Sequence, residues 1–445
     1  MTSIVATQVI HALETDPTLT NTAISSIIGS WLMDQLVNNA ITVQSNEGTR
    51  KFIKIPTTSG GVTFVPPPGD SSTLTLGEGN AVTITDKHGI VTHFDKDGDI
   101  FSWEDKNRNR VTFTYVGTGK NKNLKAVENG MGQKLEFNYN GKNQLTSVSD
   151  GFRSVSYNYD GKDSLLSFKD ALNATYRYGY GGLGLITTMY NPAFPETTTV
   201  RNTYDHAGRI QTQTDPFDNK WYYLFANGRR AEEIDALGNR RFFYYDQNGN
   251  LLLDVNQTRA GTRYTYNGIG LLTQSVSSRG LSESFTYDDK ANIVTKTISP
   301  IPKAHDVITG KPPAPITEKW TYSALSLPLT HTDFLGRMTK YDYDGQGNLV
   351  KTTQPEVAKP GVKGTHAPVT LITYNTRGLP LTITDPEGRI TQNTYDPRTF
   401  ALISTTVDPG TGRLNLTTSY SYDAVGNNTT QKDPKGYITS GTFCI

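Results

Sequence analysis

The sequence has a single cysteine, no long apolar run and almost no net charge. Cys444 is the only cysteine among 445 residues, which excludes a fold held together by disulfides within the chain. No apolar stretch approaches the roughly 18 residues that a membrane-spanning helix needs. With 43 basic and 42 acidic residues, the chain lacks a long-range field for nucleic acid or an anionic membrane. We therefore expect no nucleic-acid partner and no membrane span.

Aliphatic residues are also scarce, whereas residues typical of strands and turns are abundant. Hydrophobic residues make up 35% of the chain, yet it contains 24 tyrosines and 41 glycines. Tyrosine and threonine favour strands, and glycine and asparagine favour turns. The composition therefore predicts an all-β fold with many turns and thin cores.

Residues 1–45 differ from the rest of the chain. Apolar side chains from Ile24 to Leu36 recur at helical spacing, so we expect a short N-terminal helical segment. No basic stretch followed by an apolar core, as in a signal peptide, is visible here. Residues 46–85 follow as an irregular β lead-in, because KFIKI and VTFV alternate as strands do and VPPPGD forms a rigid turn.

From residue 86 to residue 445 the sequence repeats one short pattern. The stretch YDQNGNL, which begins at Tyr245, returns as YDHAGRI, YDGQGNL and YDAVGNN. Copies follow at intervals of about 20 to 25 residues, which gives about fifteen repeats, the last of them incomplete. Wider intervals contain polar insertions rich in proline and glycine, which are typical of surface loops. A period of this length indicates a repeat architecture.

Each repeat contains the residues of two strands and two turns. Aspartate followed three positions later by glycine is typical of a type I turn that runs into a glycine bulge. Runs such as RRFFYY, between two such turns, have the length of a strand. We expect an antiparallel array of β-hairpins, with tyrosine rings packed between strands at roughly 0.2–1 kcal/mol per pair. The positions that we assign to this structural role are Tyr204, Asp205, Gly208, Tyr245, Asp246, Gly249, Tyr343, Asp344, Gly347, Tyr422, Asp423 and Gly426.

The sequence contains no catalytic, cofactor-binding or metal-binding pattern. The seven histidines lack the spacing of metal ligands. The stretch FDKDGDI resembles part of a calcium loop, but counted from Asp95 its glycine is fourth rather than sixth, and the twelfth residue is Lys106 rather than glutamate. A repeat turn explains this stretch better. We therefore predict a protein that is not an enzyme and holds no cofactor or metal.

The repeated motif resembles the YD repeats of Rhs proteins, which also occur in the B and C components of insecticidal toxin complexes and in teneurins. The motif stands in DALGNRRFFYYDQNGNL and DFLGRMTKYDYDGQGNL, and the resemblance covers about residues 46–440. It implies a β-sheet wound into a spiral, hollow shell. In toxin-bearing members such a shell encloses a C-terminal toxic domain and ends in a self-cleavage motif. Here YDPRTFALISTTVDPGTG lacks the Arg-Tyr of that ending, and we interpret it as an ordinary repeat.

The resemblance implies a non-enzymatic shell segment of an Rhs-type polymorphic toxin system. Such a segment would enclose or present a toxin or cargo polypeptide in bacterial toxin delivery or interbacterial competition. The cargo would be a C-terminal region of a longer parent or a partner chain, and the full-length protein would be secreted or at the cell surface. The alternative is an extracellular adhesion module that binds a glycan or a protein through exposed aromatic residues. An enzyme within the insertions is a third hypothesis, for which the sequence offers no residues.

The number of repeats predicts an incomplete wall. About thirty strands at roughly 4.8 Å span about 140 Å of sheet. Wound once, such a sheet gives a ring about 45 Å across, which is too short for a capped capsule. We therefore expect a partial shell: a fragment, a truncated product or one segment of a larger assembly.

Overall fold

The computed structural model describes residues 39–441 apart from 46–47, 57–61, 195, 227–228, 301–309, 311–312, 359–363 and 424–425. These residues form strands, turns and two 3-10 turns, Glu78–Asn80 (η1) and Gly119–Asn121 (η2), with no α-helix among them. The all-β fold is therefore confirmed. The expected N-terminal helical segment lies outside the described residues, except that its last residues, Ala40–Ser45, form strand β1.

The described residues up to Ile100, together with Asp289–Ala291, form a first compact unit. Its strands are β1 (Ala40–Ser45), β2 (Gly48–Pro56), β3 (Val62–Val65), β4 (Thr73–Leu76), β5 (Val82–Thr85) and β6 (Val91–Phe94). The first three strands form one antiparallel sheet, and β4, β5 and β6 also pair antiparallel. A small apolar core is formed by Val43, Phe52, Phe64, Leu74 and Ile84. The lead-in to the repeats therefore has a core of its own.

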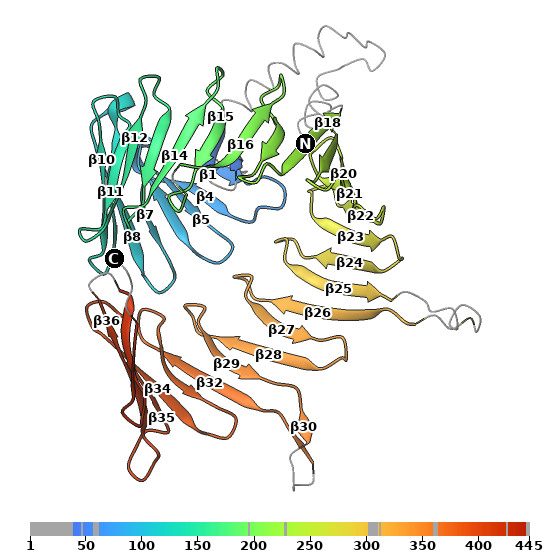
Figure 1. Ribbon diagram of the computed structural model, residues 1–445. Coiled ribbons are helices and arrows are strands. Elements are labelled where there is room, and N and C mark those ends of the chain that lie inside the picture. Colours follow the sequence, from blue (N-terminus) through green and yellow to red (C-terminus); the bar gives the residue numbers. More distant parts are fainter. Residues whose placement is uncertain are drawn as a thin grey trace. The chain divides into compact units, whose positions relative to one another are not determined.

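The second unit holds the described residues of Phe101–Asp288 and Asn292–Ile445. Its strands pair antiparallel with their neighbours in the sequence, from β7 to β29 and then from β32 to β38 (Figure 1). The short pair β30 and β31 stands apart, within an insertion. The predicted antiparallel hairpin array is thus confirmed. The strands are β7 (Ile100–Glu104), β8 (Arg110–Val116), β9 (Asn123–Asn129), β10 (Lys134–Tyr139), β11 (Leu145–Ser149), β12 (Ser154–Tyr159), β13 (Leu165–Lys169), β14 (Thr175–Tyr180), β15 (Ile186–Tyr190), β16 (Thr198–Tyr204), β17 (Ile210–Thr214), β18 (Lys220–Ala226), β19 (Arg230–Ile234), β20 (Arg240–Tyr245), β21 (Leu251–Val255), β22 (Gly261–Tyr266), β23 (Leu272–Ser277), β24 (Ser282–Tyr287), β25 (Ile293–Ser299), β26 (Ile316–Tyr322), β27 (Pro328–Thr332), β28 (Met338–Tyr343), β29 (Leu349–Thr353), β30 (Val357–Ala358), β31 (Thr365–His366), β32 (Val369–Tyr374), β33 (Pro380–Thr384), β34 (Ile390–Tyr395), β35 (Leu402–Val407), β36 (Leu416–Tyr422), β37 (Asn428–Lys432) and β38 (Ile438–Ser440).

Side chains alternate along these strands between half-buried and exposed positions. In β22, Tyr264 and Tyr266 are half-buried, whereas Arg263 and Thr265 are exposed. The register shifts between Thr265 and Tyr266, where the strand runs into its turn, and the same shift occurs at Tyr245. A bulge of this kind bends the strand and increases its twist. Because this bulge recurs in hairpin after hairpin, the bends add up and the sheet curves.

The turns of the second unit lie along two edges of its sheet, because successive hairpins of a meander turn at opposite strand ends. We call the edge with the turns that follow the repeat tyrosines the tyrosine edge. Its turns include 140–144, 160–164, 246–250, 344–348 and 375–379. We call the opposite edge the far edge. Its turns include 105–109, 129–133, 170–174, 215–219 and 235–239.

The sheet of the second unit curves until part of its far edge contacts part of its tyrosine edge. The side-chain amides of Asn107 and Asn348 exchange two hydrogen bonds of 3.0 Å, and Asn109 Nδ2 donates to the carbonyl of Arg377 at 3.1 Å. About twenty strand spacings, or roughly 100 Å of sheet, separate β8 from β28. One winding therefore needs fewer strands than the thirty assumed from the sequence, because each bulge adds curvature that a width estimate omits.

Candidate functional site

The tyrosine turn is the local structure that the second unit repeats, and the turn at 246–250 represents it. Asp246 Oδ1 accepts the backbone N–H groups of Asn248 and Asn250 at 2.8 and 2.9 Å, and Oδ2 accepts the side-chain amide of Asn250 at 2.8 Å. Gly249 has a φ of +86°, a left-handed conformation that glycine adopts without steric cost. One carboxylate thus satisfies three donors of the turn.

Other assigned aspartates make the same bonds. Asp205 Oδ1 accepts the N–H groups of Ala207 and Arg209 at 2.9 and 3.0 Å, and Arg209 Nε donates to Oδ2 at 2.8 Å. Equivalent side-chain pairs are Asp344 with Asn348 and Asp423 with Asn427, and the left-handed turn glycines are Gly208, Gly347 and Gly426. In each of these turns both carboxylate oxygens accept hydrogen bonds from the turn itself.

These bonds favour the ionised form of the turn carboxylates. The side-chain amide of Asn250, with backbone N–H groups of the turn, holds the pKa of Asp246 below its ordinary value. The guanidinium of Arg209 lowers the pKa of Asp205 in the same way, by hydrogen bonding to the carboxylate. The turns therefore carry a charge that acid would remove.

The repeat tyrosines join neighbouring hairpins through their hydroxyl groups. The hydroxyl of Tyr266 donates at 3.0 Å to the carbonyl of Leu251, the first residue after the preceding tyrosine turn. Tyr343 bonds the carbonyl of Pro328 at 2.9 Å. Burial raises the pKa of both hydroxyls, so they remain donors. The same bond is made by Tyr139, Tyr159, Tyr180, Tyr204, Tyr287, Tyr322, Tyr374, Tyr395 and Tyr422.

Alternation in the sequence predicts ring-on-ring packing of these tyrosines, and here the structure differs. Close ring pairs in the structure join Phe168 to Tyr157 and Tyr176, and Trp320 to His331. None of these rings belongs to a tyrosine turn. The partner of the repeat tyrosine is a backbone carbonyl, which has no side-chain signature. The separation between donor and acceptor is 15 residues in six of these eleven bonds, and it ranges from 14 to 29 in the others.

A socket lies between neighbouring tyrosine turns and accepts the tip of another turn. Residues 344–350 and 374–376, from two successive turns, line a cavity of about 350 Å³. Residues 106–108, the tip of a far-edge turn, line the same cavity, and Asn107 contacts Asn348 of one tyrosine turn and Gly378 of the next. Gly378 permits this approach, because a Cβ there would lie 2.6 Å from Asn107 Nδ2. We call this contact between Asn107 and the two tyrosine turns the winding contact, the far-edge turn residue the tip, and the space between the two tyrosine turns the socket.

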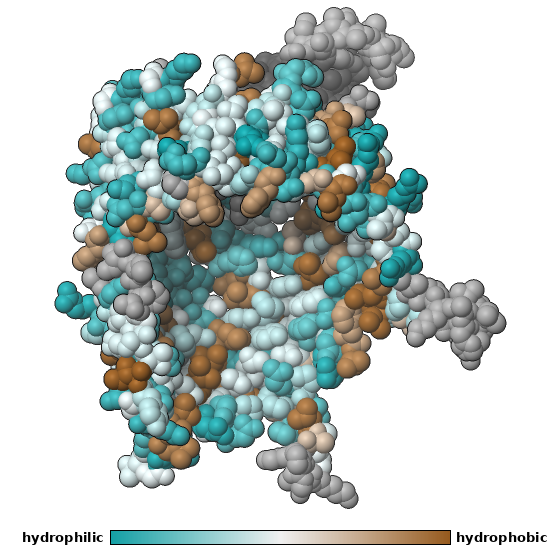
Figure 2. All heavy atoms as spheres, in the orientation of Figure 1, coloured by the Kyte–Doolittle hydropathy of each residue, from teal (hydrophilic) through white to brown (hydrophobic). Residues whose placement is uncertain are grey.

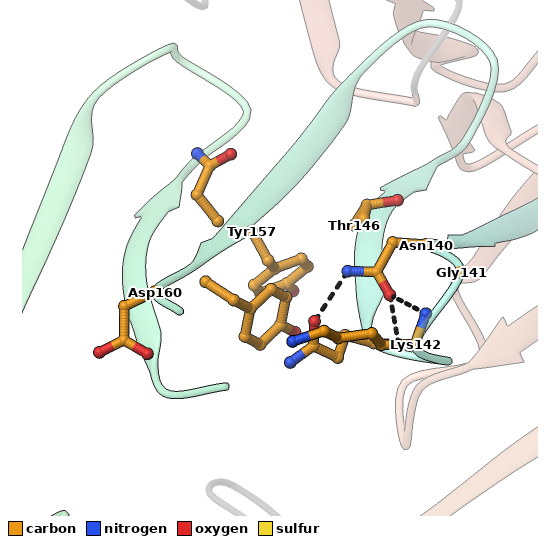
Figure 3. A pocket seen from close by; sticks show the side chains of 9 residues that line it. Asn140, Gly141, Lys142, Thr146, Tyr157 and Asp160 are labelled. Atoms are coloured by element: carbon orange, nitrogen blue, oxygen red, sulfur yellow. Dashed lines mark hydrogen bonds between the residues drawn. The ribbon is translucent and has the colours of Figure 1, made fainter. Parts of the chain in front are cut away.

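An equivalent socket of about 400 Å³ lies between turns 140–144 and 160–164 (Figure 3). Asn140 and Lys142 stand on one side of it, Asp160 on the other, and the ring of Tyr157 between them. Its lining positions 140, 142, 144, 146, 159 and 160 match 344, 346, 348, 350, 374 and 375 of the first socket. All of its lining residues come from these two hairpins, so no far-edge turn of the described chain is seated there.

The histidines and the calcium-like stretch are the parts of the sequence that come nearest to a metal-binding pattern. The described part of the chain contains no group of three or more His, Cys, Asp or Glu placed to hold a metal ion. In the calcium-like stretch, Asp95 Oδ1 accepts the N–H groups of Asp97 and Asp99 at 2.9 Å, which is the geometry of a tyrosine turn. His93 Nδ1 lies 3.2 Å from Thr83 Oγ1, an ordinary cross-strand pair. No helix formed by these residues is long and apolar enough to cross a membrane.

Comparisons with known proteins agree with this geometry. Residues 78–264 match the family model described as the teneurin YD-shell. The crystal structure of TcdB2-TccC3 is similar at 15% identity and a TM-score of 0.56, over 88% of this chain and 23% of that one. The crystal structure of TcdB2-TccC3-TEV gives 15% identity and a TM-score of 0.55, over 92% and 24%.

The similarity to these structures concerns the fold, because the identity is low. The chain spans about a quarter of the length of the structures that it matches. No curated protein matches the sequence.

Proposed function

The chain carries the YD repeats of the Rhs/YD-repeat family, and from this premise we propose that it forms part of a shell that encloses or presents a toxin or other cargo polypeptide. The wall would serve bacterial toxin delivery or interbacterial competition without enzymatic activity of its own. Its cargo would be a C-terminal region of a longer parent or a partner chain. The complete protein would be secreted or lie at the cell surface.

The observation that supports enclosure is the contact of the sheet with itself at Asn107 and Asn348. A winding of roughly 100 Å leaves about 30 Å between opposite backbones. Side chains occupy about 5 Å on each side, half the usual distance between packed sheets. The remaining width of about 20 Å is below the diameter of a folded domain of 100 residues, whose radius of gyration alone is about 13 Å. The proposed cargo is therefore an extended or partly unfolded polypeptide.

Protease protection tests this proposal. The chain is co-expressed with the polypeptide that its gene neighbourhood encodes downstream, and the complex is digested with a nonspecific protease. We expect the downstream polypeptide to survive in the complex and to be degraded when it is alone. Equal rates of degradation in the two samples would contradict enclosure.

A variant that opens the winding sharpens this test. In Asn107→Asp with Asn348→Asp, two carboxylates face each other where two amides now bond at 3.0 Å, so repulsion separates the edges. We expect protection to be lost while the β spectrum in circular dichroism remains.

Asn348→Asp also breaks the pair with Asp344 within its turn. The matched control, Asn250→Asp with Gln257→Glu, adds the same number of charges and breaks the equivalent pair with Asp246 away from the contact, and it should keep protection.

One surface favours the alternative, an adhesion module. Tyr222 and Tyr244 lie on the same face of the sheet, 42% and 36% exposed. Lys220 Nζ lies 5.2 Å from the Tyr222 ring, and the Arg230 guanidinium lies 5.9 Å from the Tyr244 ring. Exposed rings with polar neighbours offer an apolar face and hydrogen bonds to a sugar or a partner protein.

A glycan array tests the carbohydrate form of this alternative. Binding to a sugar should be lost in Tyr222→Ala with Tyr244→Ala and kept in Tyr437→Ala, whose ring is exposed elsewhere. A wild-type chain that binds no glycan on the array would remove the carbohydrate alternative.

A further inference from the structure

The far edge of the second unit carries a row of exposed apolar side chains at the tips of successive turns. Figure 2 shows apolar side chains along the margin of the sheet below the strands labelled β14 and β16 in Figure 1. The apolar tips of five successive turns on this edge, with their exposed fractions, are Phe152 (67%), Leu172 (58%), Phe194 (67%), Phe217 (84%) and Leu237 (88%). Apolar rows of this kind mark contact surfaces.

The winding contact shows what a tip at this edge does. Asn107 is the third residue of its turn, counted from Asp105, and it is seated between two tyrosine turns. Leu172, Phe217 and Leu237 occupy the same third position, counted from the aspartate that begins each turn. The apolar tips therefore have the position of a group that this fold seats in a socket.

The tip next to the winding contact is less exposed than the tips farthest from it. Met131, in the next far-edge turn after Asn107, is 37% exposed, whereas Phe217 and Leu237 are 84% and 88% exposed. At the winding contact, Asn107 meets turns that lie about twenty strands further along the sheet. At the same separation, the partner turns of 215–219 and 235–239 would lie beyond β38, the last strand that the structure describes. The most exposed tips are thus those that no described part of the chain can reach.

We propose that the far edge of one copy of this chain docks on the tyrosine edge of a second copy, with Phe217 and Leu237 seated in sockets of the kind at 140–164. The chain supplies both halves of such a contact. Tips and sockets have the same spacing along the sheet, two strand separations or roughly 10 Å, because the same strands set both. The floor of the socket includes the Tyr157 ring, a suitable surface for a Leu or Phe tip.

The size of the row suits a protein contact of this kind. An exposed Leu or Phe tip offers on the order of 150 Å². Five such tips approach the ~800 Å² that each partner of a stable complex buries. Because the two edges differ, the contact is head-to-tail and does not close on itself, so copies can add one after another. Docking of the two edges does not require that the sheet enclose a cargo.

Sedimentation velocity of the full chain over a wide range of concentrations tests the proposal. We expect the wild type to associate as concentration rises. In Phe217→Ser with Leu237→Ser the association constant should fall at least about tenfold per tip, because each buried tip contributes that much or more. Both side chains are largely exposed, so the circular dichroism of this variant should equal that of the wild type.

The matched control replaces apolar side chains that lie within strands, away from both edges. Leu224 and Leu371 are 49% and 45% exposed, and Leu224→Ser with Leu371→Ser should associate as the wild type does. A wild type that stays monomeric at every concentration overturns the proposal. So does a tip variant that associates as strongly as the wild type.

Discussion

At the scale of single residues, the repeat tyrosine acts through both parts of its side chain. The ring of Tyr266 is half-buried in the sheet, and its hydroxyl reaches the backbone of the preceding hairpin. Phenylalanine would supply the ring without the hydrogen bond. Threonine would supply a hydroxyl, but its side chain is too short to reach the backbone of the preceding hairpin. A residue that joins each hairpin to the one before it provides the nearest-neighbour coupling on which repeat proteins depend.

We predict that Tyr266→Phe lowers the stability of the second unit by about 1 kcal/mol, because it removes one hydrogen bond and leaves the Leu251 carbonyl without that donor. Thermal unfolding measured by circular dichroism gives the change. Adding Tyr343→Phe and Tyr395→Phe should lower the midpoint by a similar step each time, since distant sites are additive.

Tyr264→Phe is the control for this series. Tyr264 lies in the same strand, and its hydroxyl makes no hydrogen bond to any part of the chain that the structure covers. The control should unfold close to the wild type. If both tyrosine variants lose the same stability, the hydroxyl bond is not the source of the coupling.

At the scale of the element, the turn aspartate determines where each hairpin bends. Counted with the aspartate as the first residue, its carboxylate accepts the backbone N–H groups of the third and fifth residues, as Asp246 and Asp333 show. The glycine is the fourth residue and takes the left-handed conformation. The drift of other positions is tolerated because these bonds use backbone donors, which every residue except proline supplies.

We predict that acid destabilises the second unit below about pH 4, the ordinary aspartate pKa. Hydrogen bonds from Asn239, Asn250 and Arg337 lower the pKa of Asp235, Asp246 and Asp333 in the folded chain. A lowered folded pKa means that the unfolded chain binds more protons in this window. The stabilisation is therefore complete above the unfolded pKa and is lost as pH falls through the folded values.

The test measures the thermal unfolding midpoint at about pH 3, 5 and 7, conditions that lie on both sides of that pKa. We expect a lower midpoint only at about pH 3. Repeating the series at high salt is the control. Hydrogen bonds within a turn are little affected by screening, so the acid loss should persist there. A midpoint that does not change between the acidic and neutral samples would contradict this account of the turns.

At the scale of the whole second unit, many small bends combine into a winding. Each hairpin that carries a repeat tyrosine contributes one bulge beside it, as at Tyr245 and Tyr266, whereas the hairpin with Phe225 has no register shift. After about twenty strands the far edge meets the tyrosine edge, and Asn107 seats between two turns. Tips recur along the far edge and a second socket lies on the tyrosine edge, which is why the unit offers a surface to another copy of itself.

The repeat, the hairpins and the turns could be predicted from the sequence, because each depends on residues within one period of the chain. Asp246 and Gly249 predict their turn because both bonding partners lie within four residues. Two features could not be predicted from the sequence, and the reason is the same for both. The hydroxyl acceptor of Tyr266 is a backbone carbonyl, and Asn107 meets Asn348 across 241 residues. Only the tertiary structure decided these, since the accumulated curvature of the sheet, rather than any local pattern, brings such distant groups together.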